Sequence, residues 1–260
     1  MKGNLWRIII RWFLVLFVLV LFSFLISLAI APLHKKASLE GLVNSDSILV
    51  TGFDSILNHQ DITPLLKERV YKEALLKLAE NDSIQLVINL PDSTVCLYIK
   101  GVKIHESKAL KIKRDALLDK VSNLQYAWLF NEPIAIQTQF ATIVKEPIVE
   151  RQAPKDTIEA AANAYQPDTL VQKPAFLLME LNYGIRVILE QDRRVSFEDK
   201  WEHFKFYSHI IHNDVQFGLN NFMKIQKHDF YPTLTLEIPM DELRAIYRAL
   251  PTQSWVVIRL

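Results

Sequence analysis

Four histidines that lie close together in the sequence are the first candidates for chemistry, because clustered imidazoles can bind metal ions. They are His203, His209, His212 and His228. His209 and His212 are spaced i, i+3 and would share one face of a helix, whereas His203 would lie opposite His212. No acidic partner completes an H-E-x-x-H arrangement. The pattern favours ordinary solvated or packing histidines, so no metal and no cofactor are expected.

A cysteine nucleophile is the next candidate, and the chain has one cysteine, Cys96. A single cysteine excludes intrachain disulfides and Cys-rich metal sites. It lies in TVCLYIKGVKI, whose β-branched and aromatic residues are typical of a strand. Cys96 is therefore expected to be a small core residue.

Composition excludes two further classes of function. Lys and Arg number 30 against 29 Asp and Glu, so no net field would attract nucleic acid, and no nucleic-acid partner is expected. Six glycines are few for 260 residues, which argues against Gly-rich loops that cradle phosphates.

An uncharged apolar run at residues 12–33 predicts a membrane anchor. As a helix it would be about 30 Å long, enough to cross a bilayer core. Lys2, Arg7 and Arg11 precede it and place the N-terminus in the cytoplasm, although Lys35 and Lys36 on the other side weaken the asymmetry. We expect a single-pass inner-membrane protein whose main domain is periplasmic or otherwise extracytoplasmic.

A cleaved signal peptide is the competing interpretation, because SLAIAP supplies small residues at the end of the run. The apolar run is longer than a usual signal core of about 7 to 15 residues, and Pro32 stands where the mature chain would begin. An uncleaved anchor is the favoured interpretation.

The remaining chain divides into a connector and one domain. Residues 1–36 form the cytoplasmic stub and anchor, and residues 37–83 form a connector with one short strand at SILVTGF and an amphipathic helix from Thr63 to Asn81. That helix is expected to pack on the domain rather than on a membrane, because its charges are mixed.

Residues 84–260 predict a mainly β, sandwich-like domain with helical insertions. SIQLVINL and TVCLYIKGVKI read as a hairpin, and further strands are expected at PIAIQTQFATIV, AFLLMELNYGIRVIL, TLTLEI and SWVVIRL. Two insertions are expected, a proline-rich loop at 145–174 and a helical one at 190–231. The second contains a helix from about Phe197 to Ile225 that begins with a capping box at Ser196 and Asp199.

Three segments in the right order make this domain similar to the catalytic domain of bacterial L,D-transpeptidases. ELRAIYRALPTQSWVVI resembles the closing segment of that family, INLPDSTVCLYIKGVKI its opening hairpin, and KPAFLLMELNYGIRVI its strand that ends in Ile-His-Gly. The family implies a thiolate nucleophile that a histidine activates. Here the same alignment places Ile188 at the histidine, Thr235 at the nucleophile and Glu237 at the arginine.

These replacements predict that the domain is catalytically inactive. A threonine hydroxyl without an adjacent base is essentially never ionised at pH 7, and Glu237 reverses the charge that would favour an anion. We expect a scaffold that binds peptidoglycan or an envelope protein complex, such as a wall-synthesis, division or secretion assembly. The alternative is an active cell-wall transpeptidase or hydrolase with a displaced or metal-dependent site.

The helix at 197–225 suggests how the old catalytic groove is used. Its apolar stripe is expected to be buried, and we expect it to fill the groove at Ile188 and Thr235 while Lys205, His209 and His212 face a partner; simple packing beside the sheet is the other possibility. The stripe consists of Phe197, Trp201, Phe204, Ile211, Val215 and Phe222.

The first prediction concerns topology. A reporter that works only outside the cytoplasm should be active when fused after Leu260, and the full-length protein should fractionate with membranes, because the basic residues precede the apolar run. A soluble form that begins near Pro32 would contradict the anchor.

Overall fold

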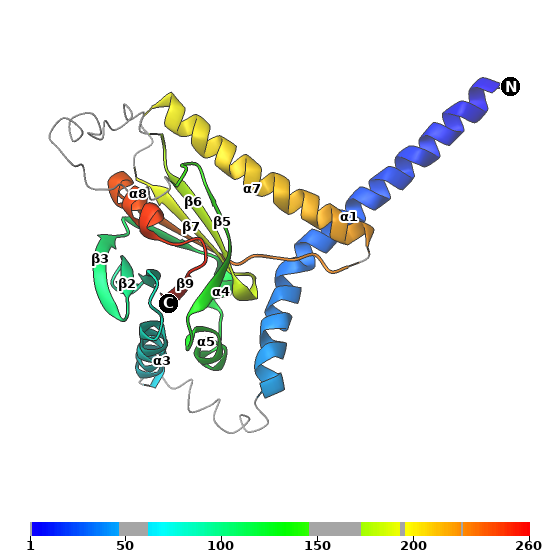
Figure 1. Ribbon diagram of the computed structural model, residues 1–260. Helices are drawn as coiled ribbons and strands as arrows, with labels where there is room; N and C mark the ends of the chain where they lie inside the picture. Colours follow the sequence, from blue (N-terminus) through cyan, green and yellow to red (C-terminus); the bar gives the residue numbers. More distant parts are fainter. Residues whose placement is uncertain (1, 47–61, 146–172, 193–195, 225) are drawn as a thin grey trace, which may run out of the picture.

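The computed structural model describes residues 2–46, 62–145, 173–192, 196–224 and 226–260. Figure 1 shows a long N-terminal helix that leads to a domain in which helices surround a β-sheet. The predicted strand at SILVTGF and most of the predicted loop at 145–174 lie outside the described residues.

The N-terminal helix, α1, extends from Lys2 to Asp46. Within the described residues, the stretch Ile10–Gly41 is the one helical segment long and apolar enough to cross a membrane, with a mean hydropathy of 3.1. Pro32 lies inside the helix, where it removes one backbone hydrogen bond and favours a kink. Residues 37–46, expected to belong to the connector, continue the helix, and Leu39 is buried. A spacing of i, i+4 lets Lys36 and Glu40 pair there.

Nine strands form one mixed sheet in the order β3-β2-β1-β9-β5-β6-β7-β8-β4. Most neighbours are antiparallel, whereas β1 runs parallel to β9 and β7 runs parallel to β8. The strands are β1 (Gln85–Asn89), β2 (Thr94–Ile99), β3 (Val102–Lys108), β4 (Lys111–Arg114), β5 (Ile134–Ala141), β6 (Phe176–Leu181), β7 (Arg186–Gln191), β8 (Thr233–Ile238) and β9 (Trp255–Arg259).

The two edge strands of this sheet are joined by only two residues, Ala109 and Leu110. Nine flat strands would place the edges about 38 Å apart, whereas three Cα steps span at most about 11 Å. The sheet must therefore be rolled. The amide of Ala109 donates to Ser93 O at 2.8 Å and the amide of Leu110 donates to Glu237 O at 2.7 Å, so this dipeptide ties both halves of the sheet together.

The corner of the rolled sheet lies at β5, whose neighbouring strand changes along its length. Its first residues pair with β9 and the rest pair with β6, with a register shift between Ile136 and Thr138. Strands that switch sheets through a bulge are how β-sandwiches form corners. The inner faces of the two halves then share one apolar core, to which β1, β2 and β5–β9 all contribute.

Helices cover both sides of the rolled sheet. Helices α5 (Asn123–Phe130) and α8 (Met240–Ala249) contribute Tyr126, Phe130, Leu243 and Ile246 to the inner core, and the short helices α4 (Ala116–Asp119) and η1 (Asn182–Gly184) lie in connections. On the outside, α3 (Ile62–Ala79) covers the β1–β2–β9 part, and α7 (Phe197–Met223) covers the β6–β7 part.

Within the described residues, strands occur where they were predicted, and both predicted helices and the Ser196–Asp199 capping box are confirmed. Two segments predicted as single strands each form two: TVCLYIKGVKI forms β2 and β3, and AFLLMELNYGIRVIL forms β6 and β7. Strand β4 and helices α4 and α5 were not predicted. The predicted fold class is confirmed in its coarse form, an apolar N-terminal helix followed by a mixed nine-stranded sheet with helices. The likeness to L,D-transpeptidases stays a prediction.

A tight turn joins β2 to β3, with positive φ at both central residues, Lys100 (48°) and Gly101 (76°). A Cβ on Gly101 would approach the Cβ of Ala79, at the end of α3, to 2.7 Å. Glycine is therefore required here both for the backbone conformation and for the close approach of α3.

Gly101→Ala should lower the free energy of unfolding by at least about 1 to 2 kcal/mol, because the left-handed conformation disfavours a Cβ. The measurement is urea unfolding of the full chain in detergent. Gly41→Ala is the matched control, since a Cβ there meets nothing within 4 Å. Equal stability of the two variants would contradict this account of the turn.

Candidate functional site

The three predicted groove residues lie side by side on the parallel strands β7 and β8. Ile188 is the Cα partner of Thr235, and Glu190 is the partner of Glu237. Leu234 and Leu236 point into the core, so alternation along the strand places Thr235 and Glu237 on the outer face. The sheet thus brings these positions together although 47 residues separate Ile188 from Thr235 in sequence (235 − 188).

Helix α7 lies over Ile188. The Ile188 side chain is 3% exposed and packs in a cluster with Phe206 and Ile210 of α7 and with Phe176 and Leu178 of β6. The helix therefore covers Ile188, as predicted, whereas the identity of this position with a former catalytic groove stays a prediction. Thr235, one strand farther out, stays partly exposed.

The face that α7 turns toward the sheet is not the predicted one. Phe206 and Ile210 face the sheet, whereas Phe197 is 82% exposed and Trp201, Phe204, Ile211 and Val215 are also exposed. The prediction that the Phe197–Phe222 stripe is buried in the groove is therefore wrong for these five residues; Phe222 is partly buried, but against α1. The physical reason is that α7 is apolar on two faces, and polar contacts decide which one packs on the sheet.

The first of these contacts is a buried guanidinium. Arg186 at the start of β7 donates to both carboxylate oxygens of Asp214 on α7, at 2.9 and 2.8 Å, and to Glu180 on β6 at 2.9 Å. The ring of Tyr231 lies 4.6 Å from the guanidinium carbon. Burial disfavours the charged form, but the hydrogen bonds and charges of Asp214 and Glu180 outweigh it, and the pKa of Arg186 is raised.

The second contact ties the N-terminal half of α7 to the same strand. The hydroxyl of Tyr207 donates to Glu190, which is 3% exposed, and His203 Nε2 lies 3.9 Å from the same carboxylate oxygen. The apolar patch around Ile188 thus lies between two polar contacts, so α7 is fixed in both register and rotation.

The histidines that attracted attention in the sequence are dispersed. His209 stacks on Phe140 of β5 with ring centroids 4.3 Å apart, and His212 is exposed. His228 is buried at the far end of α7, where its ring packs on Gly218 and lies 6.0 Å from the ring of Phe24 in α1. No group of three or more metal-ligating side chains occurs among the described residues.

Cys96 is distant from these positions in the fold. It lies on β2 and is 5% exposed, in a cluster with Tyr71 and Ala74 of α3. Burial raises the pKa of its thiol, which keeps the sulfur protonated and unreactive. The expectation of a small core residue is confirmed.

The Cα partners of Thr235 on the neighbouring strands are Ile188 and Lys113, so no histidine lies beside it in the register of these strands. Sequence reasoning missed Arg186 and Asp214. The sequence does contain a signal for this pair. Arg186 lies inside the otherwise apolar strand GIRVIL, and a buried charge requires a partner.

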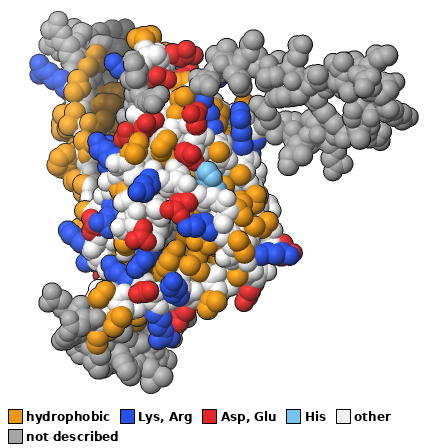
Figure 2. All heavy atoms as spheres, turned by 90° about the vertical axis from the view of Figure 1, so that its left-hand side faces the viewer, with side chains coloured by type: hydrophobic (Ala, Val, Ile, Leu, Met, Phe, Trp, Pro, Cys, Tyr) orange, Lys and Arg blue, Asp and Glu red, His pale blue; other side chains and the backbone are white. Residues whose placement is uncertain are grey.

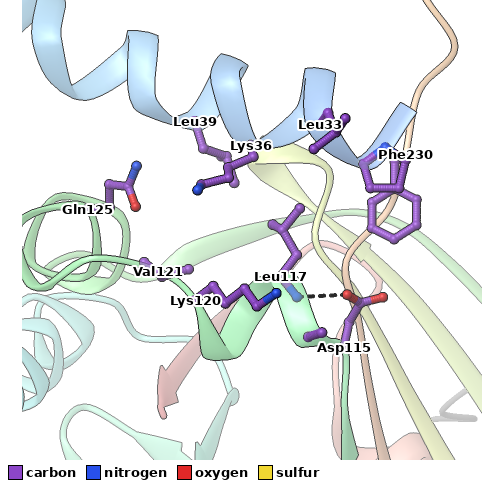
Figure 3. Close-up of a pocket in the computed structure, with 11 residues that line it drawn as sticks. Leu33, Lys36, Leu39, Asp115, Leu117, Lys120, Val121, Gln125 and Phe230 are labelled. Carbon is purple, nitrogen blue, oxygen red and sulfur yellow. Dashed lines mark hydrogen bonds between the residues drawn. The ribbon is translucent and has the colours of Figure 1, made fainter. Parts of the chain in front are cut away.

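A separate hollow of about 320 Å³ lies where α1 meets the domain. Leu33, Lys36 and Leu39 point from α1 toward Leu117 and Val121 (Figure 3). The carboxylate of Asp115, the one acidic group in the lining, accepts from the amide of Leu117 at 2.9 Å and so caps α4. The lining is apolar apart from Lys36, Lys120, Asp115 and Gln125, which suits packing rather than chemistry.

No protein-family model matches the chain, and no curated protein or solved structure matches it either.

Asp214→Ala should lower the free energy of unfolding by about 1 to 3 kcal/mol, because it leaves a buried guanidinium with one carboxylate instead of two. Urea unfolding of the full chain measures this change. Glu73→Ala is the control: it removes a carboxylate that pairs at 2.8 Å with the exposed Arg69, and such pairs contribute about 0 to 1 kcal/mol. Equal losses would show that Arg186 does not depend on Asp214.

Proposed function

We propose that the chain is a membrane-anchored, catalytically inactive scaffold of a bacterial envelope, which α1 holds at the membrane and which binds a protein partner outside the cytoplasm. One observation supports this proposal above the others: Ile188, at the position of the catalytic histidine of the resembled family, lies under Phe206 and Ile210 of the chain's own helix.

The filled groove favours a protein partner over a peptidoglycan stem peptide. A peptide that entered at Ile188 would have to displace α7 and leave both Arg186 and Glu190 buried without their partners on the helix. Removing one partner of a buried charge typically costs about 3 to 5 kcal/mol. An open polar cleft would have favoured a bound peptide, and the sheet at Ile188 is covered and apolar.

The partner-binding face in this proposal is the flank of α7 that carries Lys205, His209 and His212. His212 and Lys205 are exposed, and the latter pairs with Glu202 at 2.8 Å. His209 is held by its stacking on Phe140. These side chains sit on a helix whose position the contacts beneath it fix, and a rigid support suits specific recognition.

The sheet edges are less suitable for a partner. Edge strand β3 has a register shift between Leu97 and Tyr98 of its neighbour, and it carries Lys103, Glu106 and Lys108. Bulges and charges of this kind discourage pairing with another chain. Figure 2 shows this side of the molecule, where acidic, basic and hydrophobic side chains are interspersed.

The test is photocrosslinking in cells, with a photoreactive residue at His212 of the full-length protein and, as the control, at Leu76, which is 71% exposed on α3. A protein adduct at 212 that is absent at 76, and that Lys205→Glu weakens, is the expected result. Co-sedimentation with peptidoglycan and no protein adduct at 212 would overturn the protein-scaffold role.

A variant lacking both candidate nucleophiles, Cys96→Ala with Thr235→Ala, should restore the phenotype of a deletion strain as fully as the unaltered protein does, because neither residue takes part in chemistry. The cysteine change leaves a small cavity that should cost about 1 kcal/mol. Loss of function at normal protein levels would instead support a hydrolase or transpeptidase.

A further inference from the structure

The outward face of α7 carries an apolar stripe that nothing in the described chain covers. We define the outer stripe as the exposed apolar residues of this face, which are spaced three, four or seven apart; Phe197, Phe204 and Met223 are 82%, 60% and 67% exposed. At 1.5 Å per residue the stripe is about 39 Å long. Its members are Phe197, Trp201, Phe204, Ile211, Val215, Leu219 and Met223.

The outer stripe is not the face by which α7 packs on the domain. The opposite side of α7 already packs on the sheet through Phe206 and Ile210, and its direction is fixed by Asp214 and Tyr207. A helix that is apolar on both faces requires a second apolar environment.

The membrane helix meets one end of this stripe. Phe222 of α7 packs edge-to-face on Phe24 of α1, with ring centroids 5.6 Å apart. Phe24 belongs to the uncharged run at residues 12–33. Figure 1 shows that α7 extends away from this contact across α1 rather than along it.

The depth of the anchor places this contact at the membrane. Phe24 lies about 18 Å along this run from Trp12, at the point where α1 first contacts the domain, so a bilayer that surrounds the exposed part of the run ends near the height of α7. The residues of the run are exposed as far as Ser23, whereas Phe24 and Ser27 are partly buried and Ala31 is fully buried against the domain. Because the later part of the run is docked on the domain, the adjoining surface of the domain reaches the bilayer.

The residues beside the stripe suit the boundary between headgroups and acyl chains. The ammonium of Lys205 lies 5.5 Å from the ring centre of Trp201, a pairing of aromatic ring and long basic side chain that favours membrane interfaces. Lys200 lies on one side of the stripe, and Glu198 and Glu202 lie on the other. The attraction is therefore mainly apolar and does not require anionic lipid.

We propose that the outer stripe of α7 inserts into the interfacial layer of the bilayer beside α1, so that the domain lies against the membrane with α7 along its surface. This inference rests on the membrane anchoring of the proposed function. It adds a second lipid contact, which would fix the orientation of the flank that carries His212.

The experiment uses the full-length protein with Cys96→Ala, one copy per nanodisc of 7:3 phosphatidylcholine and phosphatidylglycerol. An environment-sensitive fluorophore is attached in separate samples to Phe204→Cys, to Val215→Cys and, as the control, to Leu76→Cys on α3. Lipids brominated near the headgroup end of the acyl chain serve as quenchers.

Fluorescence at 204 and 215 should be blue-shifted and reduced at least twofold by brominated lipid, whereas fluorescence at 76 should not change. The quenching should persist in 1 M NaCl, because the contact is apolar. Water-like, unquenched signals at 204 and 215 would overturn the proposal.

Pairing of two copies through the stripe is the other possible outcome. It would give crosslinks between copies at 215 in larger discs and no quenching in single-copy discs, and would also overturn the proposal. These experiments also distinguish failure of the scaffold function from failure of this inference. If only the scaffold function fails, the protein adduct at His212 is absent while quenching by brominated lipid at 204 and 215 persists.

Discussion

The two-residue link between the edge strands is the constraint on which the rest of the structure depends. A chain that passes from β3 to β4 through Ala109 and Leu110 cannot leave nine strands flat, so the sheet must roll and must have a corner at β5. Rolling encloses one apolar core and leaves two convex outer faces. Each of these faces has apolar side chains and needs a helix, which α3 supplies on one half and α7 on the other.

The outer face of the β6–β7 half also explains why Ile188 is buried. Parallel pairing of β7 and β8 places Ile188 beside Thr235, a position from which side chains of two strands could act on one substrate. The polar contacts of Arg186 and Glu190 hold α7 over Ile188 instead. The same two contacts also determine which face of the helix remains outside.

Much of the secondary structure was predictable because its signals are local. Alternation in TLTLEI and the capping box at Ser196 each act within a few residues, and both are confirmed. The covering of Ile188 was also predictable, but the rotation of α7 was not. On a helical wheel the stripe through Phe197 and Trp201 is more apolar than the face with Phe206, so the sequence pattern favours the wrong side. Which face of α7 packs on the sheet depends on the ion pair between Arg186 and Asp214, two residues that are distant in the sequence and that come together only in the folded domain.

The position of β9 has a consequence for how the domain is made. It is the last of the nine strands in sequence, yet it lies between β1 and β5 and joins the two halves of the sheet. As the chain emerges, the β1–β3 hairpins and the β5–β8 unit each present an unpaired edge until residues 255–259 arrive, and non-local pairing of this kind is slow. The sheet can therefore close only after residues 255–259 have been made, and until then the half-made domain would need protection from aggregation.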